Sequence, residues 1–341
     1  MQWDVLEAWM NARGLGAGPI NDVRQLTGGT QNDMTRFRRG ERDEYVLRMP
    51  PPFKRTNSDE TMRRESRMLA ALDDSDVPHP ELIAAEPDES LLGCAFYLMR
   101  PVEGCVATTG WTGPLRTDTL RRRRVGLSAA EAIASLGTID FTAAGLANFG
   151  RHNGFLERQA RRWRAAYDMY WTEPGYGEYG LEIDDVEVVE IYLDQHRPTG
   201  GPPGIVHGDM HLGNLIVADS GDVAAIVDWE LATIGDPLLD LAHLLICWPD
   251  RSGGGPFVET FAIDCAGLAS EAQIVSCYEK RSGRDVSALR WYKILAAYRL
   301  AILVEGTNVR AARGEAPRRV GDQMHRLAKS LLRRAREEVE S

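Results

Sequence analysis

Short apolar runs dominate the first part of the chain. Residues 3–13 have the spacing of a short amphipathic helix that ends at Gly14. Residues 23–52 have short, alternating apolar positions punctuated by glycines, which predicts a small antiparallel unit. Residues 58–72 have apolar positions at helical spacing and predict a helix. Strands are expected again in the sequences PELIAA and CAFYLMRPVEG.

Helical spacing takes over from about residue 114. Apolar runs of β type interrupt it within residues 205–228, in the sequences GIV, NLIVA and VAAIVDW. The helices expected on either side of this interruption cover residues 127–138, 155–170, 184–196, 237–247, 256–281, 286–312 and 317–338.

This pattern predicts an α+β protein with two lobes. A chain of 341 residues is long for a single hydrophobic core. We expect a small β-rich N-lobe over residues 1–103 and a larger, mainly helical C-lobe over residues 104–341. The connector between them is expected near residues 100–105, where Pro101 and Gly104 end the last N-lobe strand.

The charge of the chain narrows the classes of partner. The formal net charge is -10, so we expect no general binding to nucleic acid or to an anionic membrane surface. We interpret the RRRR run at residues 121–124 and the arginine-rich C-terminus as solvated helix faces. No apolar run reaches the length that crosses a membrane.

The cysteines and the N-terminal residues bear on the compartment. The cysteines number five and no pair has CxxC spacing, which predicts neither a disulfide framework nor a zinc site and favours a reducing cytosol. The N-terminal sequence MQWDVLEAWMNARGLG carries charges and has no long apolar segment, so it does not match a signal peptide. We therefore expect a cytoplasmic protein.

Polar residues gather in the sequence GIVHGDMHLGNLIVADSGDVAAIVDWE, which runs from Gly204 to Glu230. Phosphoryl transfer needs a carboxylate near the attacking hydroxyl and oxygen ligands for Mg²⁺ on the nucleotide phosphates. Asp209 and Asn214 share one predicted loop, and Asp228 ends the predicted strand VAAIVD. Asp209 and Asp228 supply carboxylates, and Asn214 supplies a neutral oxygen ligand, so these three residues meet both requirements.

Two other interpretations of this segment stay open. His207 and Asp209 are also typical of a stabilised turn, with Asp228 capping the segment that follows. His207 and His211 have the i, i+4 spacing of a zinc-binding pair, although HGDMH contains Gly208 and lacks the Glu of the HExxH motif. The complete set HxDxxxxN followed by a strand-ending Asp is more specific, and it favours the phosphoryl-transfer site.

The sequences HGDMHLGN and IVDWELATIGDPLLDLA resemble the aminoglycoside phosphotransferase and choline kinase superfamily, which has a protein-kinase-like fold. LTGGTQN, YVLRMPP, RESRMLAAL and FYLMRPVEG resemble the nucleotide loop, the following strand, the helix and the hinge of its N-lobe. WYKILAAYRLAILVEG resembles a late helix of the branch that is fused to acyl-CoA dehydrogenases in some proteins. The resemblance extends over most of the chain and implies ATP-dependent phosphorylation of a small-molecule hydroxyl.

The resemblance also implies roles for single residues of the C-lobe. Asp209 is expected to act as the catalytic base, or to orient the acceptor hydroxyl. Asn214 and Asp228 are expected to hold Mg²⁺, which agrees with the local chemistry. His207 is expected to brace the catalytic loop, and Asp240 to form a hydrogen bond with it.

In the N-lobe, the sequence GGTQN departs from the GxGxxG pattern of kinases, and a simple hairpin turn is the alternative interpretation. Gly28 and Gly29 let backbone N–H groups approach a phosphate, while Thr30 and Asn32 add polar groups. In the hinge, the resemblance implies that Met99 and Val102 flank the adenine ring of ATP.

Arg48 stands where kinases have a phosphate-binding lysine. Its planar guanidinium keeps a permanent charge and can bind two phosphate oxygens at once. Glu65, in the following helix, is expected to pair with Arg48 and hold it in place. The alternative for Glu65 is an exposed position among neighbouring arginines.

The acceptor molecule is the part of the predicted reaction that the sequence defines least. From Ala165 to Gln195 the chain contains no Lys or Arg, while acidic residues recur throughout. This segment is either a solvated acidic surface or a wall that attracts a cationic aminoglycoside. Because the resemblance to the acyl-CoA-dehydrogenase-associated branch includes the late helix, a hydroxyacyl compound or another metabolite is favoured over an aminoglycoside. A catalytically silent nucleotide-binding protein of the same fold is the alternative function.

Overall fold

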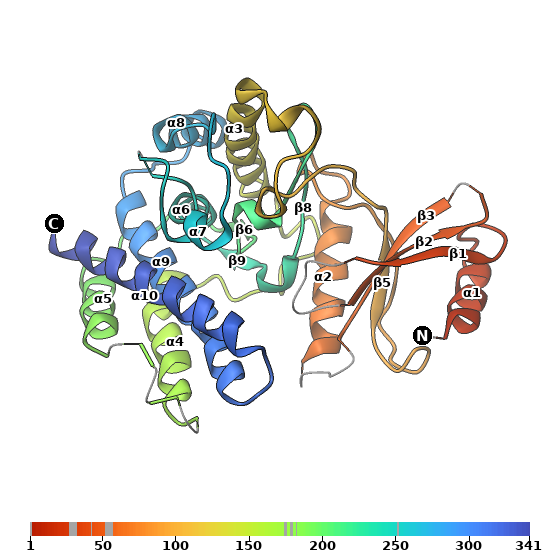
Figure 1. Ribbon diagram of the computed structural model, residues 1–341, viewed down its shortest axis with the longest axis horizontal. Coiled ribbons are helices and arrows are strands. Elements are labelled where there is room, and N and C mark those ends of the chain that lie inside the picture. Colours follow the sequence, from red (N-terminus) through yellow and green to blue (C-terminus); the bar gives the residue numbers. More distant parts are fainter. Residues whose placement is uncertain are drawn as a thin grey trace.

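The computed structural model describes residues 2–26, 33–41, 43–51, 57–173, 176–177, 180–181, 183–250 and 252–341. It confirms the predicted α+β class with two lobes (Figure 1). A five-stranded sheet forms the N-lobe, and the rest of the chain is mainly helical.

The N-lobe sheet has the strand order β1-β2-β3-β5-β4, and all neighbouring strands are antiparallel. Two helices accompany it, and Figure 1 shows α1 at the outer side of the sheet and α2 between the sheet and the C-lobe. The elements are α1 (Trp3–Ala12), β1 (Ile20–Gln25), β2 (Asp33–Arg39), β3 (Asp43–Met49), α2 (Ser58–Leu72), β4 (Leu82–Glu86) and β5 (Phe96–Met99).

The sheet is buried on both faces, because its central strands carry apolar residues at consecutive positions. Tyr45 and Leu47 of β3 pack in a small core that includes residues of α1. Val46 points to the opposite face and joins the large core that continues into the C-lobe. Since side chains alternate along a strand, Arg48 lies on the same inner face as Val46, directly opposite Tyr97 of β5.

In the described residues, the C-lobe consists of helices packed around two short antiparallel strand pairs. Its helices are α3 (Thr119–Leu136), α4 (Phe155–Tyr170), α5 (Ile183–Gln195), α6 (Leu238–Ile246), α7 (Pro256–Phe261), α8 (Glu271–Ser282), α9 (Leu289–Ala312) and α10 (Arg318–Glu340). Strands β6 (Gly204–Val206) and β9 (Thr233–Gly235) pair with each other, as do β7 (Leu215–Val217) and β8 (Val223–Ile226). Short 3-10 helices cover Ala107–Thr109, Gly113–Arg116, Leu212–Asn214 and Trp229–Leu231.

One predicted helix is wrong. Residues 256–281 form two helices, α7 and α8, because the backbone between them cannot continue a helix. Ala262 ends α7 with a left-handed φ of 51°, and Gly267 has a φ of 84°. Ser270 then caps α8 in a capping box with Gln273. Helix α3 also begins eight residues earlier than predicted, at Thr119, where Asp118 caps it.

The interpretation of the RRRR run as a solvated face is wrong for Arg122. Its side chain is 5% exposed, and it donates hydrogen bonds to the carbonyls of Leu115, Arg116 and Ala266. It also forms an ion pair with Asp264 at 2.7 Å. Because its acceptors lie both near the start of α3 and in the segment between α7 and α8, Arg122 holds these two parts of the C-lobe together.

Contacts from α2 and from the connector help to join the lobes. Arg64 of α2 donates to the carbonyls of Phe149 and Ala232 at 3.0 and 3.1 Å. In the connector, Cys105 and Val217 exchange backbone hydrogen bonds. Gly104 must be glycine there, because its φ is 151° and a Cβ would lie 2.5 Å from the Val217 carbonyl oxygen.

Two further features concern the thiols and the apolar helices. All five cysteines carry free thiols. Within the described ranges, the structure has no helix that is both long and apolar enough to span a membrane.

Candidate active site between the two lobes

The predicted catalytic loop follows β6, and a hairpin brings its two ends together. The loop runs from His207 to Asn214, where β7 begins. Strand β8 returns antiparallel to β7 with Leu215 opposite Ile226. The next pair outward is Asn214 and Val227, which are joined by a backbone hydrogen bond of 2.9 Å. This register places Asn214 beside Asp228, although the two are separated in the sequence.

Asp240 holds the start of the loop. Its carboxylate accepts hydrogen bonds from the backbone N–H groups of His207 at 2.6 Å and Gly208 at 2.8 Å. Burial raises the pKa of Asp240 to about 6, and the two N–H donors oppose that shift. Gly208 has a φ of 85°, and a Cβ there would lie 2.6 Å from the carbonyl oxygen of Leu231. Only glycine therefore fits between His207 and Asp209.

His207 is fully buried and braces the loop through both ring nitrogens. Its Nδ1 accepts from the Asp209 backbone N–H at 3.2 Å, and its Nε2 donates to the Val227 carbonyl at 3.0 Å. Burial lowers the pKa of His207 to about 4, so the ring is neutral at physiological pH. Because both nitrogens are engaged, the zinc pair with His211 is wrong.

The carboxylate of Asp209 lies among nitrogen groups. The Asn214 side-chain amide donates to the Asp209 backbone carbonyl at 2.8 Å and to its carboxylate at 3.1 Å. His211 Nε2 and His243 Nε2 lie 3.4 and 3.5 Å from the two carboxylate oxygens. Burial acts to raise the pKa of Asp209, but His211 and the other histidines outweigh it and the pKa lies below its usual range. Asp209 is therefore ionised and able to orient a hydroxyl.

Three residues around Asp209 were not predicted from the sequence. His211 was considered only as a zinc ligand, His243 lay outside every motif, and Arg299 lay within WYKILAAYRLAILVEG but was given no role. His243 lies one helical turn after Asp240 on α6, so the i, i+3 spacing on that helix was the available signal. Arg299 is one arginine among many in the sequence, and only its burial distinguishes it.

Arg48 and Glu65 form a buried pair on the inner face of the N-lobe sheet. Arg48 Nε and Nη2 donate to the two oxygens of Glu65 at 2.8 and 2.7 Å. The Tyr97 hydroxyl donates to the same carboxylate at 2.9 Å. Arg48 Nη2 also lies 2.8 Å from Asp228 Oδ1, so one guanidinium links the N-lobe helix to the end of the β8 strand. The alternative of an exposed Glu65 is wrong, since its side chain is 0% exposed.

Asp228 has a left-handed backbone with a φ of 69°. A non-glycine residue in this region carries conformational strain, which is common at functional sites. Strand β8 ends at Ile226 and the Trp229–Leu231 turn begins directly afterwards. The strained backbone turns the Asp228 carboxylate toward Arg48 between the lobes.

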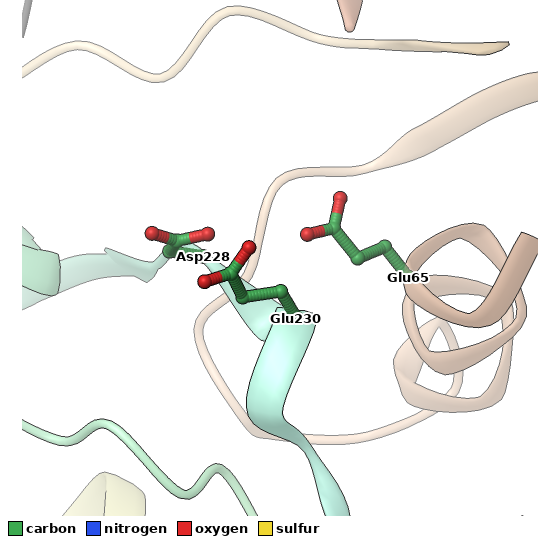
Figure 2. Close-up of side chains that lie close together, drawn as sticks. All are labelled: Glu65, Asp228 and Glu230. Atoms are coloured by element: carbon green, nitrogen blue, oxygen red, sulfur yellow. The ribbon is translucent and has the colours of Figure 1, made fainter. Parts of the chain in front are cut away.

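Three carboxylates gather at this point, from Glu65, Asp228 and Glu230 (Figure 2). One ligand oxygen of each lies within 4.8 Å of the others. Both oxygens of Glu65 are already engaged by Arg48, whereas Asp228 and Glu230 leave the same short segment toward each other. Burial raises the pKa of Glu230 to about 7, and the charges of Asp228 and Glu65 add to that shift.

This oxygen set fits a magnesium ion. Mg²⁺ prefers one or two carboxylates together with neutral oxygens and water. Asp228 and Glu230 supply the carboxylates, and the Asn214 amide nitrogen is bonded to Asp209, which leaves its carboxamide oxygen to face a cation. One arginine among three acids leaves an excess of negative charge that a divalent cation would balance. Glu230 was not predicted as a ligand.

The remaining predicted site residues belong to the N-lobe and the connector. Met99 ends β5 and is 9% exposed, and half-buried Val102 follows in the connector. Both therefore lie at the junction of the lobes. Gly28, Gly29, Thr30 and Asn32 lie outside the described residues.

Among the described residues of the acidic segment, the carboxylates pair with arginines from outside it. Arg164 pairs with Asp168 at 2.8 Å, with Glu190 at 2.9 Å and with Glu187 at 3.6 Å. Further pairs join Asp185 to Arg336, Glu173 to Arg313, and Asp194 to both Arg161 and Arg197. These carboxylates are ion-pair partners within the C-lobe, which weakens the interpretation of the segment as a wall for a polycation.

Comparisons with known proteins bear on this arrangement. Residues 22–274 match the model of a family described as the phosphotransferase enzyme family. The probable acyl-CoA dehydrogenase IBR3 of Arabidopsis thaliana is 30% identical over 303 residues, which cover 84% of this chain and 36% of that protein. The chain thus spans little more than a third of the length of this curated relative.

Two solved structures are similar along the whole chain. A putative aminoglycoside phosphotransferase from Ralstonia eutropha JMP134 is 29% identical with a TM-score of 0.78, over 98% of both chains. A mutant of the aminoglycoside phosphotransferase APH(4)-Ia, in a ternary complex with ADP and hygromycin B, is 16% identical with a TM-score of 0.56. It covers 96% of this chain and 97% of its own, and this second likeness concerns the fold alone.

Proposed function

Because this chain belongs to the phosphotransferase enzyme family, we propose that it is an ATP-dependent kinase that transfers the γ-phosphate to a hydroxyl of a small molecule. The observation that carries the proposal is the assembly of Asp209, Asn214 and Asp228 at one end of the β7–β8 hairpin, with Arg48 bonded to Asp228 from the other lobe. If these residues only stabilised a turn, the contact between Arg48 and Asp228 across the lobes would not be needed.

In this proposal Asp209 orients the acceptor hydroxyl and accepts its proton as the phosphoryl group is transferred. Its ionised state and its contacts with Asn214 and His211 support that role. His207 and Asp240 fix the position of Asp209, since together they bind three backbone N–H groups of the loop.

Mg²⁺ would be held by Asp228 and Asn214, as predicted from the sequence, with Glu230 as an additional carboxylate. The ion supplies charge neutralisation to the transferring phosphates. Arg48 would bind phosphate oxygens with its fork held by Glu65.

Residues 1–103 form the nucleotide-binding lobe in this proposal, and residues 104–341 the catalytic and acceptor-binding lobe. Met99 and Val102 would flank the adenine at the connector. Gly28, Gly29, Thr30 and Asn32 would cover the phosphates.

For the acceptor, we favour a hydroxyacyl compound or another hydroxylated metabolite over an aminoglycoside. The ion pairs of the acidic segment support this order, because carboxylates already bound to arginines attract a polycation weakly. The likeness to an acyl-CoA dehydrogenase relative supports it as well.

The test is a panel of acceptors with radiolabelled ATP and Mg²⁺, including kanamycin-type aminoglycosides and hydroxyacyl compounds. We expect phosphorylation of at least one hydroxyl acceptor, and its loss in Asp209→Asn. The catalytically silent alternative would bind Mg-ATP, seen as a thermal shift, and transfer phosphate neither to an acceptor nor to water.

A further inference from the structure

Arg299 is a buried arginine that has no hydrogen-bond or ion-pair partner among the described residues. It lies in the middle of α9 and is 5% exposed. Among the described residues it forms no hydrogen bond and no ion pair, and its Nη1 is fully buried without an acceptor. Buried charges in proteins are normally paired, because desolvation without compensation is costly. An unpaired guanidinium in the interior therefore needs an explanation.

The guanidinium lies against the catalytic loop. A Cβ on Gly208 would be 3.1 Å from Arg299 Nη2, so the arginine contacts the residue that directly precedes Asp209. Its Cζ lies 5.3 Å from the ring centroid of Trp163 on α4. Helix α9, helix α4 and the catalytic loop thus meet at this side chain.

The nearby carboxylates form neither a hydrogen bond nor an ion pair with the Arg299 guanidinium. Asp209 and Asp240 are the acidic groups that act on Arg299 electrostatically, and the exposed Arg162 is the nearby cation. The two oxygens of Asp240 accept from the His207 and Gly208 backbone N–H groups. The Asp209 carboxylate is bonded to Asn214, and neither acid forms an ion pair with Arg299. Nη1 is fully buried, so Nε and Nη2 are the Arg299 donors that remain for a further acceptor.

Two neighbouring side chains also have unused nitrogens. Trp163 Nε1 and both ring nitrogens of His243 are buried without hydrogen-bond partners in the described part of the chain. Trp163 is 8% exposed and His243 is 0% exposed. His243 lies beside Asp209 and Trp163 beneath Arg299. The Trp163 N–H and the single N–H of the neutral His243 ring are thus donors without acceptors in the described part of the chain, close to Arg299 and to the proposed catalytic carboxylate.

We propose that Arg299 binds a carboxylate of the acceptor, so that this protein phosphorylates hydroxy acids rather than cationic sugars. The proposal rests on the kinase function proposed above and names the class of its acceptor. A guanidinium matches a planar carboxylate with two parallel N–H donors. Since consecutive Cα atoms are about 3.8 Å apart, a group bound beside Gly208 is close to one oriented by Asp209. We therefore expect the acceptor to carry the hydroxyl and the carboxylate on one short skeleton.

The experiment compares the positional isomers of hydroxybutanoate with the matching hydroxybutanamides, which keep the hydroxyl and lose the charge. Wild type, Arg299→Met and Arg299→Lys are assayed for kcat/KM with Mg-ATP. Arg162→Gln is the matched control, because Arg162 is exposed and lies 5.5 Å from the same Trp163 ring. Mg-ATP affinity and thermal stability are measured for every variant, so that misfolded variants are recognised.

We expect wild type to prefer the acid over the amide of the best isomer by about ten- to a hundredfold, as a charge-assisted hydrogen-bond pair provides. The preference should vanish in Arg299→Met, recover in part in Arg299→Lys and persist in Arg162→Gln. Equal use of acid and amide by wild type, or an unchanged preference in Arg299→Met, would overturn the proposal.

A second measurement separates this proposal from the kinase function itself. Butanoate lacks the hydroxyl and cannot be phosphorylated, so its binding to the protein with Mg-ADP, by ligand-observed NMR, reports the carboxylate site alone. We expect binding by wild type and at least tenfold weaker binding by Arg299→Met. If butanoate binds in this way but no acceptor is phosphorylated, the kinase function fails and the carboxylate site stands. If aminoglycosides are phosphorylated and butanoate does not bind, the kinase function stands and the carboxylate site fails.

Discussion

Replacing Glu65 with Gln should destabilise the protein and weaken its binding of Mg-ATP. In the native protein Glu65 only accepts hydrogen bonds, two from Arg48 and one from Tyr97. Burial raises the pKa of Glu65 against the pull of Arg48, but three donors around two oxygens require the ionised carboxylate. A glutamine amide has one oxygen, and its NH₂ group would face another donor.

The magnitude follows from the burial of the pair. The Glu65 side chain is 0% exposed and that of Arg48 is 6% exposed. Removing one partner of a buried pair costs about 3–5 kcal/mol, because the other charge stays desolvated. Asp228 still contacts Arg48 at 2.8 Å, but its side chain is 35% exposed and its charge is partly hydrated. We therefore expect Glu65→Gln to lower the free energy of unfolding by an amount near the lower end of this range, about 3 kcal/mol.

Glu44→Gln is the matched control. Glu44 lies on β3, the same strand as Arg48, and it also accepts hydrogen bonds from arginines. Its side chain is 29% exposed, so its ion pairs contribute little to stability. The assay is urea unfolding followed by fluorescence, with Mg-ATP affinity measured by calorimetry. If the two variants lose equal free energy of unfolding, or if Glu65→Gln binds Mg-ATP as well as wild type, the argument is refuted.

Further predictions concern the catalytic loop, the metal and the phosphate contact. Asp209→Asn should bind nucleotide nearly normally and lose about 10²- to 10⁴-fold in turnover; more than about a tenth of wild-type turnover in the kinase assay would exclude Asp209 as the catalytic carboxylate. Asp228→Ala should abolish Mg²⁺-dependent binding of ATP, and an unchanged Mg-ATP affinity by calorimetry would contradict its role as a ligand. Arg48→Ala should weaken ATP binding far more than adenosine binding, while equal losses in the two titrations would indicate a defect of folding instead. Burial lowers the pKa of His243 to about 3 from an unfolded value of 6.5, so wild type should lose stability as the pH falls through the interval between these values. Between pH 7 and pH 5, the free energy of unfolding should fall by about 2 kcal/mol less in His243→Leu than in wild type. If urea unfolding shows the same fall in both proteins, the histidine does not titrate in this way.

The sequence by itself determined the local parts of this protein. Side chains alternate along a strand, so Val46 and Arg48 belong to one face of β3, and the structure has them on the inner face of the sheet. The spacing HxDxxxxN predicted a loop with several polar groups, and the hairpin after it brings Asn214 next to Asp228. Period and spacing are properties of neighbouring residues, so these features could be predicted without knowledge of the packing.

Helix boundaries within the C-lobe were less predictable. Residues 256–281 have enough apolar positions for one helix, and the break at Ala262 requires a left-handed residue that the apolar pattern does not reveal. Arginine was the least predictable residue type. Arg122, Arg162 and Arg299 all lie in helices, yet the first is buried and bonded, the second is exposed, and the third is buried and unpaired.

Only the tertiary structure decided which distant charges meet. Arg48 and Asp228 are 180 residues apart in the sequence, and their contact depends on how α2 and the sheet pack against the C-lobe. The same packing pairs Arg164 with the acidic segment and, in the described part of the chain, leaves Arg299 beside Gly208 without a hydrogen-bond or ion-pair partner. The free energy of a charge depends on its burial and on the groups around it, and neither is a property of the local sequence.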